Sequence, residues 1–93
     1  MELTESVKGL LTSCITELID HQDDLNVNVR QENDESAKEG YSIFADIKVN
    51  SEDVGKVIGR QGRTIKSLRT LARALGAKHG IRVEVEIIEE DKE

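Results

Sequence analysis

The apolar side chains of residues 3–20 recur at intervals of three and four positions. This spacing places them on one side of an α-helix, which has about 3.6 residues per turn, and predicts an amphipathic helix that covers a core. Thr4 is predicted to cap the start of this helix, which is expected to end near Asp20 and His21. Its apolar positions are Val7, Leu10, Leu11, Cys14, Ile15, Leu18 and Ile19.

Three later segments alternate apolar and polar side chains, which is typical of strands with one buried face. They are residues 25–30, 41–50 and 81–87. The polar and acidic residues 31–40 end at Gly40 and predict an exposed loop or hairpin connection between the first two strands. We expect these two strands to pair antiparallel, and the third to return parallel to the second after a helical crossover.

Two helices are predicted between the second and third strands. Asn50 or Ser51 can cap the first, short helix. Its apolar side consists of Val54, Val57 and Ile58. A longer helix over residues 63–78 follows and stops at Gly80. Its inward side chains are expected to be Ile65, Leu68, Leu71, Ala72 and Leu75. Gly76 is expected to loosen the last turn of this helix, because glycine is a poor helix former.

The resulting order, α-β-β-α-α-β, predicts an α+β fold in which helices pack on one face of a three-stranded mixed sheet. We expect one domain over residues 1–93, with a frayed tail at 89–93. The other sheet face is expected to be solvated, since it carries Arg30, Asp46, Lys48, Arg82, Glu84 and Glu86. Phe44 also lies on this face, where neighbouring side chains could cover it, or where it could meet a protein partner or a base.

Charge is distributed unevenly along the chain. The sequence has 13 basic and 19 acidic residues, a net charge of −6. Eight of the basic residues fall between Gly55 and Arg82, a segment that contains no acidic residue. A basic segment inside an acidic protein predicts a local anion-binding surface. The acidic remainder disfavours non-specific binding to nucleic acid.

The residues Gly59-Arg60-Gln61-Gly62 lie within this basic segment, between the two predicted helices. Glycine permits a positive φ and close approach of the backbone to a ligand, and a helix start offers unpaired N–H groups to a phosphate. The spacing fits neither a P-loop, which needs Lys-Ser/Thr after its last glycine, nor the dinucleotide fingerprint, which needs a further G-x-G. We therefore predict a clamp for a nucleic-acid backbone, against the alternative of a plain corner between two helices.

Ten residues around this corner are the predicted nucleic-acid contacts, in three roles. Backbone amides hold phosphates, basic side chains add charge, and two apolar residues with a strand edge form a groove for bases. The residues are Lys56, Val57, Ile58, Gly59, Arg60, Gln61, Gly62, Arg63, Lys66 and Arg69. The chain has no Trp, one Phe and one Tyr, so base stacking is scarce and sequence preference should be low.

The sequence gives little support for catalytic or metal chemistry. His21 and His79 lie in different elements away from any candidate nucleophile, and one Cys with two His does not make a zinc site. Cys14 falls on the apolar helical stripe, which favours a buried structural thiol. The acidic pair Glu52-Asp53 is expected to cap a helix or to keep the surface soluble. We find no apolar run of membrane-spanning length and no signal peptide, and we expect a cytoplasmic protein that is no enzyme and has no cofactor.

The segment Asp53-Val54-Gly55-Lys56-Val57-Ile58-Gly59-Arg60-Gln61-Gly62-Arg63-Thr64-Ile65 resembles the G-x-x-G region of a KH domain. The element order resembles the bacterial, type II form of that domain. Over nearly its whole length the chain resembles the small bacterial single-KH-domain RNA-binding proteins of the KhpA type. It departs from their pattern in a longer, more acidic loop after the first strand and in Gln22, where a proline is usual.

The resemblance implies binding of single-stranded RNA, with about four nucleotides held across the G-x-x-G loop. It also implies a role as an RNA chaperone or post-transcriptional regulator, linked to cell shape and cell-wall homeostasis. The implied protein partner is a second copy, as a homodimer, or a larger KH-containing protein of the Jag type. Two other functions stay open: a ribosome- or transcription-associated KH module that binds structured RNA, and a protein-interaction domain that uses Phe44 or the helix faces.

Overall fold

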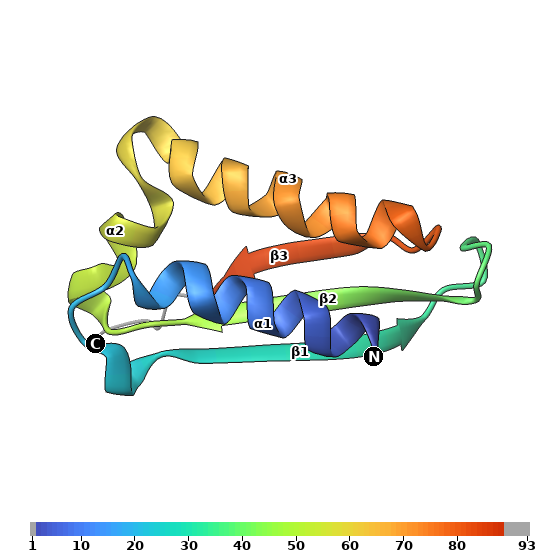
Figure 1. Ribbon diagram of the computed structural model, residues 1–93, viewed down its shortest axis with the longest axis horizontal. Helices are drawn as coiled ribbons and strands as arrows, with labels where there is room; N and C mark the ends of the chain where they lie inside the picture. Colours follow the sequence, from blue (N-terminus) through green and yellow to red (C-terminus); the bar gives the residue numbers. More distant parts are fainter. Residues whose placement is uncertain (1, 89–93) are drawn as a thin grey trace.

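The computed structural model describes residues 2–88 (Figure 1). The helices are α1 (Leu3–Thr16), α2 (Val54–Ile58) and α3 (Arg63–Lys78), and the strands are β1 (Asn26–Asn33), β2 (Tyr41–Lys48) and β3 (Val83–Ile87). Short 3₁₀ turns η1 (Gln22–Asp24), η2 (Ser51–Asp53) and η3 (Arg60–Gly62) lie between them. The predicted order of helices and strands is therefore confirmed.

The strands form one mixed sheet in the order β1-β2-β3. β1 runs antiparallel to β2, with Asn26 opposite Lys48. β2 runs parallel to β3, with Ile43 opposite Val83. A parallel pair needs a crossover connection, and the segment that contains α2 and α3 supplies it. Both predicted pairings are confirmed.

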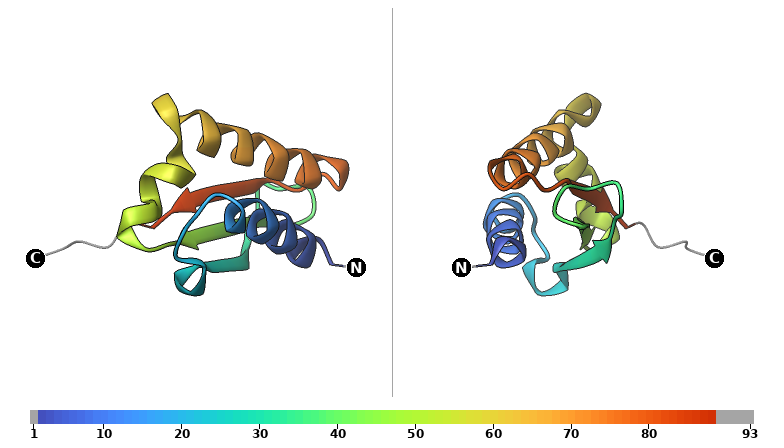
Figure 2. Two further views of the ribbon diagram at one scale, coloured as in Figure 1. Left: turned by 60° about the vertical axis from the view of Figure 1, so that its left-hand side comes forward. Right: turned by 90° about the vertical axis from the view of Figure 1, so that its right-hand side faces the viewer.

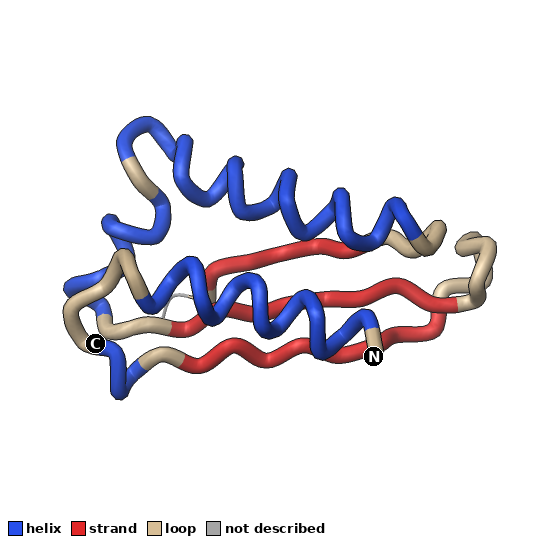
Figure 3. The backbone as a smooth tube through the Cα atoms, in the orientation of Figure 1, coloured by secondary structure: helices blue, strands red, loops and turns tan. Residues whose placement is uncertain are grey.

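Helices α1 and α3 pack against each other and cover one face of the sheet (Figures 1 and 2). The core lies between this helical layer and the strands, and the smooth backbone in Figure 3 shows the two layers without side chains. Burying a large aliphatic side chain contributes about 1.5–3 kcal/mol, so this layer is the main source of stability. Among the most fully buried side chains are Val7, Leu11, Ile15, Ile43, Ile47, Val57, Val83 and Val85.

Helix α1 is shorter than predicted. It ends at Thr16, although Leu18 and Ile19 continue its apolar spacing. The capping prediction was also wrong, since Thr4 lies inside the helix and the cap position is Glu2, whose side chain makes no capping bond. The chain leaves the helix early because it turns toward η1, and Ile19 still reaches the core from that turn, with 5% of its surface exposed.

Strand β1 is longer than predicted. It continues to Asn33, which pairs with Tyr41, so the connection covers residues 34–40 and not 31–40. Backbone pairing with β2 does not require apolar side chains, which is why the polar composition of residues 31–33 hid this part of the strand. Asp34 then organises the connection by accepting hydrogen bonds from the hydroxyls of Ser36 and Ser42, each at 2.6 Å.

Helix α3 has the predicted bounds, but two of its residues differ from expectation. Leu71 does not face inward and is 49% exposed. Gly76 does not loosen the helix; it lies where α3 approaches the chain entering β3. A Cβ atom at Gly76 would be 2.2 Å from the carbonyl oxygen of Ile81 and 2.5 Å from Cγ2 of Val83. Gly76 is therefore a packing requirement of the helix–sheet contact.

The open face of the sheet is polar, as predicted, and Phe44 on it is half-buried. The guanidinium of Arg30 lies over the Phe44 ring, 5.3 Å from its centroid. Arg30 is held there by ion pairs with Asp46 and, at 2.7 Å, with Glu32. Cover by a neighbouring side chain, one of the alternatives for Phe44, is therefore present.

The tail that was expected to fray, residues 89–93, lies outside the described residues. Within residues 2–88, no helix combines the length and the apolar character that crossing a membrane requires.

The substitution Gly76→Ala is expected to lower the free energy of unfolding by about 1–3 kcal/mol, because the new methyl group overpacks the contact with Ile81 and Val83. This loss is larger than the gain from helix propensity, since alanine is favoured over glycine in a helix by about 1 kcal/mol. The matched control is Gly9→Ala in α1, where an added Cβ meets nothing within 4 Å. Urea unfolding should show a neutral or stabilised control, and equal shifts in the two variants would contradict the packing role.

Candidate nucleic-acid interface

The corner between α2 and α3 has an unusual backbone. Three of its residues have positive φ: 81° at Gly59, 58° at Gln61 and 75° at Gly62. A Cβ at Gly59 would lie 2.2 Å from Oγ1 of Thr64, so this position needs glycine for space as well as for its φ. Positive φ at Gln61 costs on the order of 1–2 kcal/mol. Strain of this kind at an exposed residue is a pointer to function.

The corner is exposed and stands away from the sheet at one end of the molecule (Figures 1 and 2). The side chains of Arg60, Gln61 and Arg63 are exposed, and the two glycines are partly accessible. Helix α3 starts directly behind the corner and is 16 residues long. Its N-terminal end therefore presents a positive dipole end toward solvent at the corner.

The basic side chains at the corner have different surroundings. Arg60, Arg63 and Lys66 are exposed and make no ion pair among the described residues. Lys56, in contrast, is engaged: its Nζ lies 3.3 Å from Oδ1 of Asp53 and 3.3 Å from Oδ2 of Asp20. The hydrogen bonds to Asp53 and Asp20 raise the pKa of Lys56 above its ordinary value. Lys56 thus lies at the base of the corner as a structural cation.

The other side chains predicted to contact nucleic acid differ in how accessible they are. Val57 is fully buried, so its side chain belongs to the core, whereas Ile58 beside it is half-buried. Arg69 is held against the sheet, where its Nε donates to the carbonyl oxygen of Val85 at 3.0 Å. This bond covers part of the outer edge of β3. The apolar surface next to the corner is therefore smaller than the sequence suggested.

Asp53 has a role that the sequence analysis missed. It was expected to cap or to solubilise, but it is completely buried. Its carboxylate accepts hydrogen bonds from the backbone amides of Asp20 at 3.1 Å and His21 at 2.9 Å, in addition to the contact with Lys56. Burial opposes ionisation of this carboxyl, but the bonds from His21, Asp20 and Lys56 outweigh it and lower the pKa of Asp53. Asp53 therefore ties the base of the corner to the segment that follows α1.

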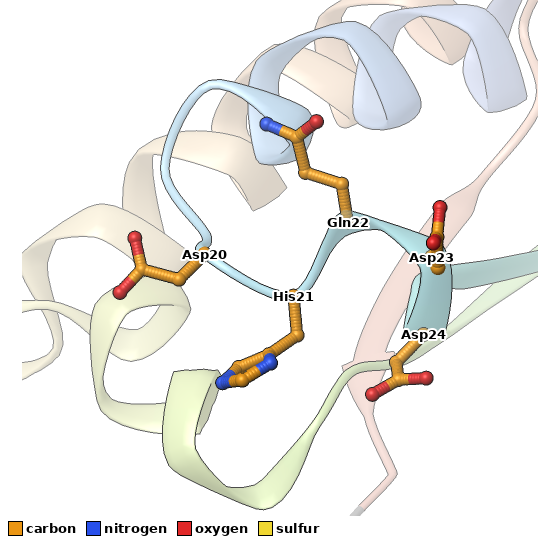
Figure 4. Close-up of a pocket in the computed structure, with 5 residues that line it drawn as sticks. All are labelled: Asp20, His21, Gln22, Asp23 and Asp24. Carbon is orange, nitrogen blue, oxygen red and sulfur yellow. The ribbon is translucent and has the colours of Figure 1, made fainter.

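That segment forms an open, acidic pocket of about 450 Å³ (Figure 4). It is lined by Asp20, His21, Gln22, Asp23 and Asp24. The ring of His21 points toward η2, where its Nε2 lies 3.0 Å from Glu52, and the Gln22 amide donates to the Thr16 carbonyl at 3.0 Å. Within residues 2–88, no three acidic, His or Cys side chains gather as a metal site. Its negative charge makes this pocket unsuitable for a phosphate.

One sequence signal could have pointed to Asp53. An acidic residue three positions before a lysine in a helix can form an ion pair with it. The partner amides, however, lie more than thirty residues earlier in the chain, and no local pattern connects them to Asp53.

The substitution Asp53→Asn is expected to destabilise the protein at neutral pH and to reduce its sensitivity to acid. Because the folded-state pKa of Asp53 is lowered, its contribution to stability is present above the unfolded-state value of about 4 and is lost as pH falls through the lower folded value. Urea midpoints measured between neutral pH and about pH 3 test this. The control Asp23→Asn removes an equal charge from an exposed position and should leave the neutral-pH midpoint nearly unchanged; equal loss in both variants would contradict the anchoring role.

Comparison with known proteins identifies relatives along nearly the whole chain. The profile of the KhpA/KhpB KH domain matches residues 8–87. RNA-binding protein KhpA of Halalkalibacterium halodurans is 39% identical over 83 residues, which cover 89% of this chain and 100% of the relative. KhpA of Bacillus subtilis is 36% identical over 85 residues, or 91% of this chain and 96% of the relative. The relatives thus carry binding and not enzymatic names, in agreement with the expectation that the chain is not an enzyme.

Two solved structures of Era share the fold at low sequence identity. Aquifex aeolicus Era bound to GDP and aluminium fluoride aligns with a TM-score of 0.62 at 15% identity, over 97% of this chain and 33% of the Era chain. Era in complex with MgGDPNP and a segment of 16S ribosomal RNA aligns with a TM-score of 0.61 at 16% identity, over the same shares. The chain therefore spans about a third of Era, and the likeness concerns the fold alone. From the family profile, the full-length relatives and the type II order of helices and strands, this chain belongs to the KhpA/KhpB family of KH-domain proteins.

Proposed function

We propose that this protein binds single-stranded RNA and holds its sugar–phosphate backbone across the corner Gly59–Gly62. The observation that carries the proposal is the exposed, positive-φ backbone of this corner at the start of α3, in a chain of the KH family. The relatives that are named RNA-binding proteins support the class of ligand. KH domains clamp about four nucleotides of backbone at their G-x-x-G loop.

In this mechanism, the corner and the first turn of α3 receive phosphates, and Arg60, Arg63 and Lys66 supply the charge that attracts them. Few side chains are available to stack on RNA bases. The chain has one Phe and one Tyr, and Arg30 already covers Phe44. The proposed binding therefore has little preference for RNA sequence. Contacts with the RNA phosphates dominate it, so the affinity should fall as salt is added.

The proposed physiological role is that of an RNA chaperone or post-transcriptional regulator that acts in the cytoplasm, with links to cell shape and cell-wall homeostasis. This role is taken from the family resemblance. A ribosome- or transcription-associated module that binds structured RNA is the competing role. Sequencing of RNA that is crosslinked to the protein in cells separates them, because a chaperone yields many transcripts and a ribosomal module yields mainly ribosomal RNA.

The double substitution Arg60→Asp with Gln61→Asp is expected to abolish binding to a short single-stranded RNA, because it places two carboxylates where the phosphates would lie. The exposed corner should tolerate the change without unfolding. Fluorescence anisotropy with labelled oligo(U) measures the affinity, and circular dichroism checks the fold.

A charge-matched control is available on the solvent side of α1. Lys8→Asp with Ser13→Asp alters the net charge by the same amount at two exposed positions and should bind RNA nearly as well as the wild type. Unchanged affinity in the corner variant, or an equal loss in both variants, would refute the clamp.

We also propose that two KH-containing chains associate, either two copies of this protein or one copy with a Jag-type partner, since joining two weak modules raises their combined affinity for RNA. The exposed Leu71 of α3 supports an apolar contact in the helical layer. Leu71→Lys is expected to shift the wild-type mass in gel filtration from dimer to monomer, whereas the control Ala77→Lys, also on α3 and exposed, should not. A monomeric wild type would contradict the homodimer and leave the Jag-type partner as the candidate, to be tested by mixing the two proteins.

A further inference from the structure

Three basic residues of α3, Lys66, Arg69 and Arg73, form what we call the basic flank. Their spacing of three and four residues places them along one side of the helix. This side faces the edge of β3, because Arg69 donates to the Val85 carbonyl at 3.0 Å and Arg73 reaches Glu84 at 3.1 Å. The basic flank begins one helical turn behind the corner and follows α3 away from it.

A carboxylate lies at the far end of the basic flank. Glu84 on β3 accepts a hydrogen bond from Nη2 of Arg73 at 3.1 Å and one from Nε of Arg82 at 2.8 Å. It is the first acidic residue after Asp53 in the sequence. The hydrogen bond from Arg82, with that from Arg73, lowers the pKa of Glu84 despite its partial burial, so the carboxylate stays charged. Both guanidinium groups are therefore occupied by an internal anion.

We propose that Glu84 sets the length of RNA that the protein can hold, because it occupies the arginines that would otherwise extend the phosphate-binding surface from the corner along α3. This inference rests on the proposed RNA clamp. A carboxylate and a phosphate compete for the same guanidinium donors. With Glu84 in place, the surface that attracts RNA ends near Lys66 and Arg69. Without Glu84, Arg73 and Arg82 would contact the next nucleotides of the RNA. Both arginines are largely exposed.

The two arginines would not contribute equally. The charge of Asp34 also acts on Arg82 and helps to raise its pKa, whereas the only ion pair of Arg73 among the described residues is the one with Glu84. Each additional phosphate contact to a single strand steepens the dependence of log K on log salt by about 0.7, which is worth about fourfold in affinity near physiological salt. If only Arg73 is released from Glu84, we expect the affinity for RNA to rise about fourfold. If Arg82 is released as well, we expect a larger rise.

The test compares the near-isosteric variant Glu84→Gln with the wild type on two oligo(U) probes. One probe has about four nucleotides and the other about twelve, roughly three times the footprint of a KH clamp. The variant should bind the short probe as the wild type does and bind the long probe at least about fourfold more tightly, with a salt slope steeper by about 0.7 to 1.4.

The matched control is Glu86→Gln, which removes the same charge from the same side of β3 at an exposed position with no ion pair in the described part of the chain. Equal gains in both variants, or no gain in Glu84→Gln, would overturn the role of Glu84 while leaving the clamp intact. Adding Arg73→Gln to Glu84→Gln should cancel most of the gain, and an undiminished gain would overturn the role of Arg73. If the wild type binds neither probe, the proposed function itself fails, and this inference fails with it.

Discussion

The buried carboxylate of Asp53 is the contact on which the position of the corner depends. Burying a charged group is costly unless hydrogen bonds satisfy it. Asp53 meets this condition with two backbone amides from the segment after α1 and the ammonium group of Lys56. The same bonds satisfy the amides of Asp20 and His21, where the chain has left α1. One side chain thus joins the segment between α1 and η1 to the start of α2.

This anchor separates a rigid base from an exposed tip. At the base, Val57 is in the core and Lys56 is paired. At the tip, Gln61 keeps a positive φ and Arg60 and Arg63 extend into solvent. A strained, charged tip is tolerable because packing of α2 and α3 fixes both of its ends. Gly76 contributes at the other end of α3, where the missing side chain lets the helix lie close to the chain entering β3.

Much of the fold followed from local patterns. The period of apolar residues identified the three main helices and the three strands, and the approximate bounds predicted for α3 agree with the structure. The errors occurred where the local pattern and the tertiary context diverge. Leu18 and Ile19 continue the helical period after α1 has ended. Residues 31–33 are polar but pair with β2. Leu71 has the spacing of a core residue but is exposed on the surface of α3.

The sequence by itself determined the composition of the candidate site: two glycines around two polar residues, inside a segment without acidic residues, at the start of a long helix. These are local properties, set by backbone conformational freedom and by charge along the chain. Only the tertiary structure decided which basic residues are engaged. Asp53 meets amides 32 and 33 residues away, and Glu84 meets Arg73 across 11 residues. Such pairings depend on how the elements pack, and a one-dimensional pattern of charge carries no information about that packing.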